Sequence, residues 1–258
     1  MSSLDPLSPT EPSDPWKKLS RFTPARIGLG RTGGSLLTKA QLDFRLAHAR
    51  ARDAVQAPFL LPELTETLQR LQLSTVHLST LATNRQQYLL RPDLGRTLTD
   101  SSRSLLQGES TRWGSRNLAI LISDGLAAQA ANLQAVPTLQ PLIDTLARQG
   151  WSFYPIFLVP FARVKLQDEV GEILGARHTL MLLGERPGLG SPDSLGAYFT
   201  YRPQASCRDA QRNCVSNIRP EGFPPPQAAR KIAQLLIKSA QKQVSGVDLK
   251  DTDLPLLD

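Results

Sequence analysis

The chain has 258 residues, of which 40% are hydrophobic, so it is long enough to bury one or two hydrophobic cores. Its formal net charge is +7, but the basic residues are scattered and form no block, which argues against a nucleic-acid-binding surface. No apolar run is long enough to cross a membrane, and the first residues do not resemble a secretory signal. Two cysteines, Cys207 and Cys214, match neither a disulfide framework nor a common zinc pattern, which favours a reduced, cytoplasmic setting.

The N-terminal part is predicted to be helical. Residues 1–15 are rich in Pro, Ser and Asp and are expected to form a flexible tail. From residue 16 to 112 the chain is expected to be mainly helical, with the clearest helix at 39–55, where apolar residues recur at helical spacing. A shorter helix is expected at 63–73, after two prolines, and a glycine-rich loop at 28–34.

Residues 113–258 are predicted to form an α/β domain. Short apolar runs bounded by polar residues predict strands at 118–122, 151–159, 179–183 and 197–201. Helices are expected after residue 125, at 166–174 and at 226–244. This alternation is typical of right-handed βαβ units, so we expect an open, mainly parallel, Rossmann-like sheet flanked by helices.

Ligands of open α/β sheets bind beyond the carboxyl ends of the strands. Three distinctive loops are expected there, at residues 123–125, 161–165 and 184–188. The segment 213–217 follows the fourth candidate strand and could close the same crevice. The sequence therefore predicts a ligand crevice lined by these segments.

The residues of this crevice do not form a catalytic set. Glu185 follows an apolar strand, so its carboxylate must be solvated or paired, either with Arg186 or with an amide or hydroxyl of a ligand. The loop after Gly184 lacks the Lys-Ser/Thr pair of a P-loop, and Cys214 has no nearby histidine to activate it. The three histidines are isolated, so neither catalytic residues nor a metal site is predicted.

The glycines at positions 28, 30 and 33 loosely match a dinucleotide-binding fingerprint. No convincing strand precedes them, which weakens the match. A stand-alone Rossmann-like enzyme with a nucleotide cofactor is therefore kept as the alternative function.

Eight segments, spread in order over residues 14–251, resemble the small subunits of ethanolamine ammonia-lyases. In the N-terminal part they are DPW at 14–16, TPARIGLGR at 23–31, LDFRLAHARARDAV at 42–55 and RPDLGR at 91–96. In the C-terminal part they are SDGL at 123–126, GERPGL at 184–189, RNCVSNIRP at 212–220 and SGVDLKD at 245–251. Because the segments occur in order along most of the chain, chance similarity at one motif does not explain them.

The resemblance implies a function that composition does not show. Such enzymes convert ethanolamine to acetaldehyde and ammonia by a radical route that depends on adenosylcobalamin (coenzyme B12). A barrel-shaped large subunit binds the substrate, and the small subunit is active only as its partner in a hetero-oligomer. The benzimidazole of the cofactor stays on cobalt, which agrees with the lack of an Asp-x-His-x-x-Gly motif in this chain. Some members work inside bacterial microcompartments, and the sequence leaves this open.

By position, the resemblance implies that Val164, Glu185 and Cys214 contact the cobalamin. We expect apolar packing and backbone hydrogen bonds at Val164 and Cys214, and an acceptor for corrin amides or the ribose at Glu185. The family often has glycine where this chain has Ala162. If that position needed a positive φ, alanine would shift the backbone there.

Overall fold

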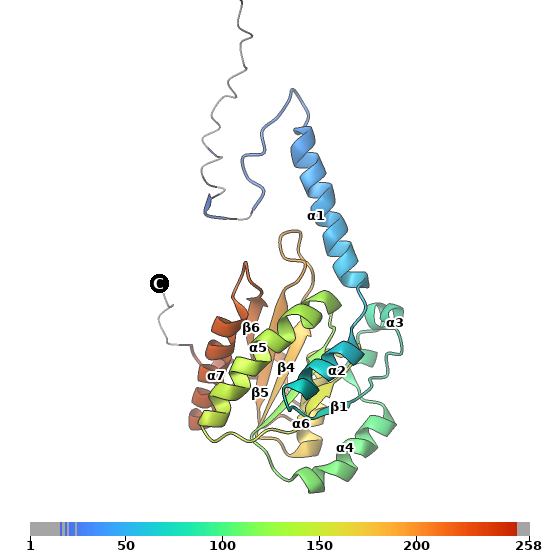
Figure 1. Cartoon of the computed structure of the whole chain (residues 1–258), viewed down its shortest axis with the longest axis vertical. Helices are drawn as coiled ribbons and strands as arrows, with labels where there is room; N and C mark the ends of the chain where they lie inside the picture. The colour runs from blue at the N-terminus through green and yellow to red at the C-terminus, as the bar shows by residue number, and fades with distance from the viewer. Residues whose placement is uncertain (1–15, 17–18, 20, 24, 252–258) are drawn as a thin grey trace, which may run out of the picture. The chain divides into compact units, whose positions relative to one another are not determined.

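The computed structural model describes residues 16, 19, 21–23 and 25–251 (Figure 1). The chain divides into two compact units, residues 1–50 and 51–258, and each is described by itself. The predicted tail at residues 1–15 lies outside the described residues.

The first unit contains less helix than expected. Helix α1 (Thr38–Gln56) confirms the helix predicted at 39–55, but residues 25–37 are not helical, so the expectation of mainly helical structure from residue 16 is wrong for this stretch. Gly28, Gly30 and Gly33 have φ values of 61°, 70° and 61°, in the left-handed region that a right-handed helix excludes. The glycine-rich segment is therefore a loop that precedes α1.

Six strands of the second unit form one sheet in the order β1-β3-β2-β4-β5-β6. The strands are β1 (Thr75–His77), β2 (Leu118–Ser123), β3 (Ile156–Leu158), β4 (His178–Gly184), β5 (Leu195–Tyr201) and β6 (Arg212–Ile218). The first four strands are parallel to one another, whereas β5 and β6 are antiparallel to their neighbours. The predicted open, mainly parallel α/β sheet is confirmed.

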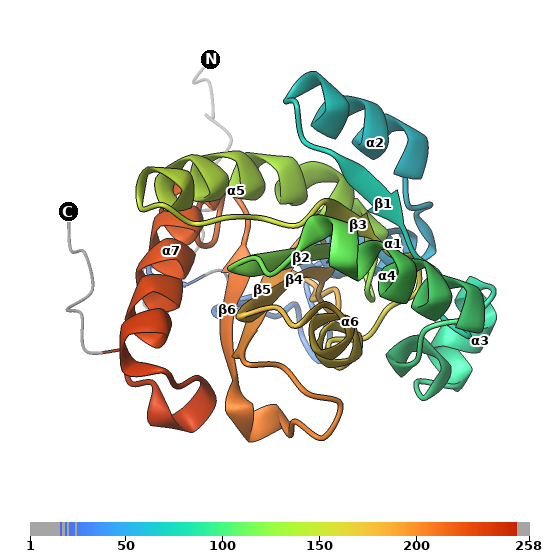
Figure 2. The same ribbon diagram turned by 90° about the horizontal axis from the view of Figure 1, so that it is seen from below.

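Helices cover both faces of this sheet (Figure 2). One face packs against α2 (Leu61–Arg70), α5 (Ala128–Arg148) and α7 (Pro225–Lys242), and the other against α4 (Asp100–Trp113) and α6 (Leu166–Leu174). We call these the α5 face and the α6 face. In β4, Leu180 and Leu182 point to the α5 face, and Met181 and Leu183 to the α6 face. A short helix, α3 (Arg85–Leu90), precedes α4.

Three strands differ from the sequence-based expectation. β3 is shorter than 151–159 and begins after Pro155, which has no N–H to donate to a neighbouring strand. The edge strand β1 was not predicted. The segment 213–217, for which no strand was predicted, forms most of β6. Val215 is buried, whereas Cys214 and Ser216 are exposed, so β6 lacks the apolar run that marked the other strands.

Candidate functional site

The three loops predicted to converge lie together at the carboxyl ends of β2, β3 and β4. The Leu126 N–H donates to the carbonyl of Gly184 at 2.8 Å. Gly125 has a φ of 53°, and a Cβ atom at this position would clash with the same carbonyl. The Ala162 N–H donates to Ser123 Oγ at 3.1 Å. The three loops therefore meet at one edge of the sheet, as predicted from the strand order.

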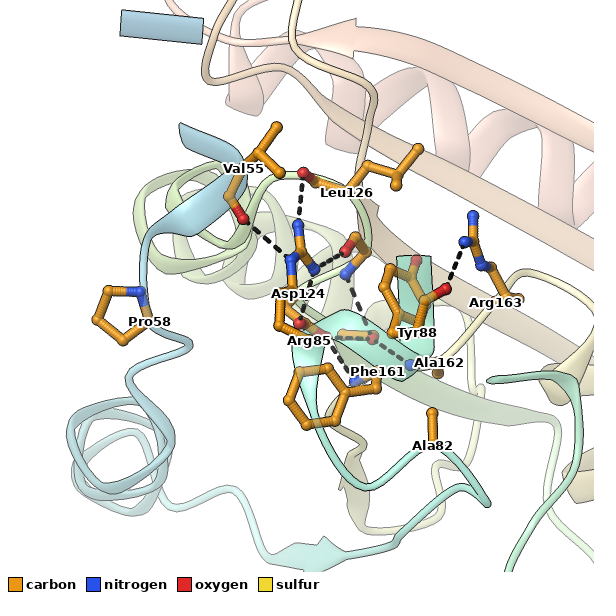
Figure 3. A network of polar contacts seen from close by, with 12 residues as sticks. Val55, Pro58, Ala82, Arg85, Tyr88, Asp124, Leu126, Phe161, Ala162 and Arg163 are labelled. Atoms are coloured by element: carbon orange, nitrogen blue, oxygen red, sulfur yellow. Dashed lines mark hydrogen bonds and ion pairs between the residues drawn. The ribbon is translucent and has the colours of Figure 1, made fainter. Parts of the chain in front are cut away.

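The crevice between β2 and β3 is filled by the chain itself. After β2 the chain crosses to α5 on one face, and after β3 to α6 on the other, so the topological switch point lies between these strands. Asp124 occupies it and is only 2% exposed. Arg85 Nη1 lies 3.2 Å from Asp124 Oδ2, and the Phe161 N–H donates to Asp124 Oδ1 at 2.6 Å (Figure 3). The usual ligand position of an open α/β sheet is thus closed.

The guanidinium of Arg85 is hydrogen-bonded to several acceptors of the chain. Its guanidinium donates to the carbonyls of Val55, Gly125 and Leu126 at 2.9, 2.5 and 2.7 Å, in addition to Asp124. Burial raises the pKa of the Asp124 carboxyl, whereas the Phe161 N–H and the charge of Arg85 lower it. Sequence reasoning missed Arg85. The available signal was Asp124, a carboxylate directly after a buried strand that needs a cation as partner.

On the α6 face of β5 and β6, Thr200 and Arg212 contact Asp168 of α6, whereas Cys214, further along β6, is exposed. In β5, Ala197 and Phe199 belong to the core of the α5 face, so Gly196 and Tyr198 point to the α6 face. In β6, Cys214 is the Cα partner of Tyr198 and is exposed. We define the β5–β6 patch as Glu185, Gly196, Tyr198 and Cys214, because these residues meet on this face.

Glu185 is held at the edge of the patch with one oxygen available. Its Oε2 accepts hydrogen bonds from Ser194 Oγ at 2.5 Å and from the Asn217 N–H at 3.3 Å. Among the residues that the structure describes, no ion pair joins Glu185 to Arg186, and no hydrogen bond uses its Oε1. A Cβ atom on Gly196 would lie 2.7 Å from that oxygen, so glycine at this position allows the carboxylate to pack against β5. The carboxylate is thus oriented as an acceptor for a further donor.

Tyr198 and Cys214 form a neutral polar pair across the two strands. They are Cα partners on β5 and β6, so their side chains are neighbours on the same face of the sheet. Burial of the sulfur raises the pKa of Cys214 to about 11; the neighbouring Tyr198 hydroxyl lowers this pKa, and the negative charge of Glu185 raises it. Burial also raises the pKa of Tyr198. Because such a thiol is protonated at neutral pH, Cys214 is not an activated nucleophile.

Val164 lies in the loop between β3 and α6. It is half-buried and packs against the core of the α6 face, as Tyr198 does. The structure therefore brings Glu185 and Cys214 together in one patch and places Val164 on the core that borders it. Phe161, with a φ of 58°, takes the left-handed conformation in this loop. Ala162 does not, so alanine fits at that position.

Neither a metal-binding cluster nor a helix able to span a membrane is found among the described residues. Within residues 16, 19, 21–23 and 25–251, no group of three or more His, Cys, Asp or Glu side chains could hold a metal ion. His178 is buried between Trp151 and Tyr201 and bonds to Ser239 Oγ at 3.1 Å, which is a packing role. None of the helices described is both long and apolar enough to cross a membrane.

Comparisons with known proteins agree with one another. Residues 13–250 match the family model described as "Ethanolamine ammonia-lyase light chain (EutC)". The ethanolamine ammonia-lyase small subunit of Pseudomonas fluorescens Pf-5 is 48% identical over 244 residues, which cover 94% of this chain and 89% of that relative. The small subunit of Azotobacter vinelandii is 49% identical over 92% of this chain and 88% of its own length. That of Pseudomonas putida GB-1 is 49% identical over 96% and 91%. The chain belongs to the ethanolamine ammonia-lyase light chain family.

Proposed function

We propose that this chain helps to hold adenosylcobalamin against the large subunit of an ethanolamine ammonia-lyase, which deaminates ethanolamine to acetaldehyde and ammonia. The observation that carries the proposal is the β5–β6 patch. It combines an oriented carboxylate, a neutral phenol and a neutral thiol on one sheet face, where Glu185 and Tyr198 are half-buried and Cys214 is exposed. Such a patch can bind and orient a ligand, but it offers no group that would activate a substrate.

The residues of the patch fit the chemistry of a corrin. The rim of a corrin carries amides, which donate hydrogen bonds, and Glu185 Oε1 is free to accept one. Val164 offers an apolar contact for the adjacent edge of the corrin ring, and Cys214 and Tyr198 offer weak polar contacts. When bound, adenosylcobalamin supplies radical chemistry through its cobalt–carbon bond. The patch contains no histidine, which favours a base-on cofactor that keeps its own benzimidazole on cobalt.

A partner subunit follows from the same features. The relatives are named as small subunits, which implies a large one. The patch lies on one sheet face, so this chain can cover only one side of a large cofactor. We infer that the large subunit covers the other side and supplies the reacting groups, and that the two form a hetero-oligomer that is active only as a complex.

The alternative, a stand-alone enzyme with a nucleotide cofactor, has less support. A dinucleotide fingerprint must follow a strand and open a helix. None of the described residues before Gly28 lies in a strand. The switch-point crevice, where such cofactors bind, is closed by Arg85 and Asp124.

The proposed function is tested by ethanolamine deamination with adenosylcobalamin. The chain alone, the large subunit alone and the mixture of both are assayed side by side. We expect turnover only in the mixture. A soluble, folded mixture that neither associates nor deaminates ethanolamine would refute the proposal.

The site is tested by cobalamin binding to the two-subunit complex, with hydroxocobalamin as the probe. Glu185→Gln removes the charge of the acceptor and should raise the Kd about tenfold, the range for one lost charge-assisted hydrogen bond. Glu66→Gln is the matched control, because Glu66 lies in an exposed ion pair with Arg70 on α2. Equal Kd values for the two variants would show that Glu185 does not contact the cofactor.

A further inference from the structure

The loop that carries Val164 has a conformation that it would not adopt alone. Phe161 has a φ of 58°, a region that residues with a Cβ atom rarely occupy. Such a conformation persists only where the surrounding structure imposes it. Contacts with other segments of the chain must therefore stabilise this loop conformation.

Asp124 and Ser123 hold the loop from the β2 side. The Phe161 N–H donates to Asp124 Oδ1 at 2.6 Å, and the next N–H, that of Ala162, donates to Ser123 Oγ at 3.1 Å. Ser123 Oγ in turn lies 3.1 Å from Asp124 Oδ1. Two successive peptide groups are thus fixed by two successive side chains at the end of one strand.

The opposite side of the loop is held by the segment that leads into α4. The Arg163 N–H donates to the carbonyl of Gly95 at 2.7 Å, and Thr80 Oγ1 donates to the carbonyl of Phe161 at 3.3 Å. The Arg163 guanidinium donates to the carbonyl of Tyr88 at 2.9 Å and lies 4.1 Å from the centre of its ring (Figure 3). The three residues before Val164 are therefore all bonded to other parts of the chain.

Arg85 stabilises the buried, charged form of the Asp124 carboxyl group. Asp124 is almost fully buried, and a buried carboxylate needs a cation and hydrogen-bond donors. Arg85 supplies the cation, and its remaining donors are fixed by the carbonyls of Val55, Gly125 and Leu126. A lysine could not satisfy these acceptors together, because an ammonium lacks the planar fork of a guanidinium. The two residues act as one unit.

We propose that Asp124 and Arg85 are positioning residues for the cofactor: by fixing Phe161 and Ala162 they set the place of Val164. Their own charged groups are occupied within the chain, so they act through the loop and not by contact with the ligand. This inference rests on the proposed cobalamin site. The switch-point crevice of the sheet then has a role although it is closed: the Asp124–Arg85 pair inside it positions the loop of the neighbouring cofactor site.

The test uses the two-subunit complex and hydroxocobalamin as the probe. Asp124→Ala should raise the Kd about tenfold, as loss of a supporting residue does at other preorganised sites, and should speed hydrogen exchange at the Phe161 and Ala162 amides. Asp124→Asn keeps an acceptor oxygen and should recover part of the affinity. Arg85→Lys should weaken binding in the same way as Asp124→Ala.

A matched control separates positioning from general loss of stability. Leu139 is fully buried in α5, on the opposite face of the sheet, so Leu139→Ala should lower the unfolding temperature without changing the Kd. The inference is overturned if Leu139→Ala weakens binding as much as Asp124→Ala, or if Asp124→Ala exchanges faster but keeps the wild-type Kd. A wild-type complex that binds no cobalamin overturns the proposed function as well. If Glu185→Gln raises the Kd as expected but Asp124→Ala keeps the wild-type Kd, the positioning role alone is overturned.

Discussion

The buried ion pair between α6 and β6 allows the energetics of the fold to be tested quantitatively. Asp168 is fully buried, the Arg212 side chain is 4% exposed, and the two are in direct contact. Burial raises the pKa of Asp168, whereas Arg212 lowers it. Asp168→Ala would leave a buried guanidinium without this partner, which costs about 3–5 kcal/mol of unfolding free energy in comparable cases. We expect about 3 kcal/mol here, because the exposed Asp209 still pairs with Arg212.

Denaturant unfolding of the single variants and of Asp168→Leu/Arg212→Met provides the assay. Removing both charges and filling their volume should restore most of the lost free energy, because neither charge is then buried alone. Asp93→Ala is the control, since its pair with Arg91 is exposed and its loss should have no measurable effect. The reasoning fails if Asp168→Ala is as stable as Asp93→Ala, or if the double variant is no more stable than Asp168→Ala.

Three further predictions concern single groups. Burial, helped by the nearby Arg177, lowers the pKa of His178 to about 3, so its contribution to stability is complete above pH 6.5 and falls by about 1.4 kcal/mol per pH unit below it. Urea unfolding at two pH values, about 7 and 5, should show a steeper drop for the wild type than for His178→Gln, and equal drops would contradict this. Gly175→Ala, at a φ of 62° with open space around it, should cost about 1 kcal/mol, whereas Gly125→Ala also clashes with the end of β4 and should cost about 3 kcal/mol; equal losses of melting temperature would refute the difference. Cys214, with its pKa raised from 9.0 to about 11, should react with iodoacetamide about a hundredfold more slowly than an ordinary thiol at pH about 8, and a normal rate would show that the thiol is not shielded.

The sequence predicted the parts of the fold whose signal is local. β2 and β4 are buried on both faces, so they appear as apolar runs, and α6 ends at Gly175, a left-handed helix cap. β6 has buried residues on one face and polar ones on the other, so its sequence has no continuous apolar run that would predict a strand. The edge strand β1 has only three residues, and its pairing with β3 depends on a segment 81 residues away. That information is not present in either segment alone.

The residues of the candidate site likewise divide into those with a local sequence signal and those that depend on distant segments. Glu185 stood out because a carboxylate directly after a buried strand requires a partner, whereas Val164 and Cys214 were identified only by resemblance to the family. The place of Tyr198 beside Cys214 was not predicted because it depends on the pairing of β5 with β6. Arg85 was missed because nothing near it in the sequence marks it as the partner of Asp124, which lies 39 residues further along.

The position of the patch follows from how the sheet is completed. A parallel sheet with helices on both faces leaves a ligand only the crevice beyond the strand ends, and here Arg85 and Asp124 fill that crevice. After β4 the chain instead turns back into β5 and β6, and no crossover helix lies between these antiparallel strands. Cys214 is therefore exposed on a sheet face next to the carboxyl end of β4, where Glu185 stands. In the proposed complex, the large subunit would cover the side of the ligand that faces away from this sheet.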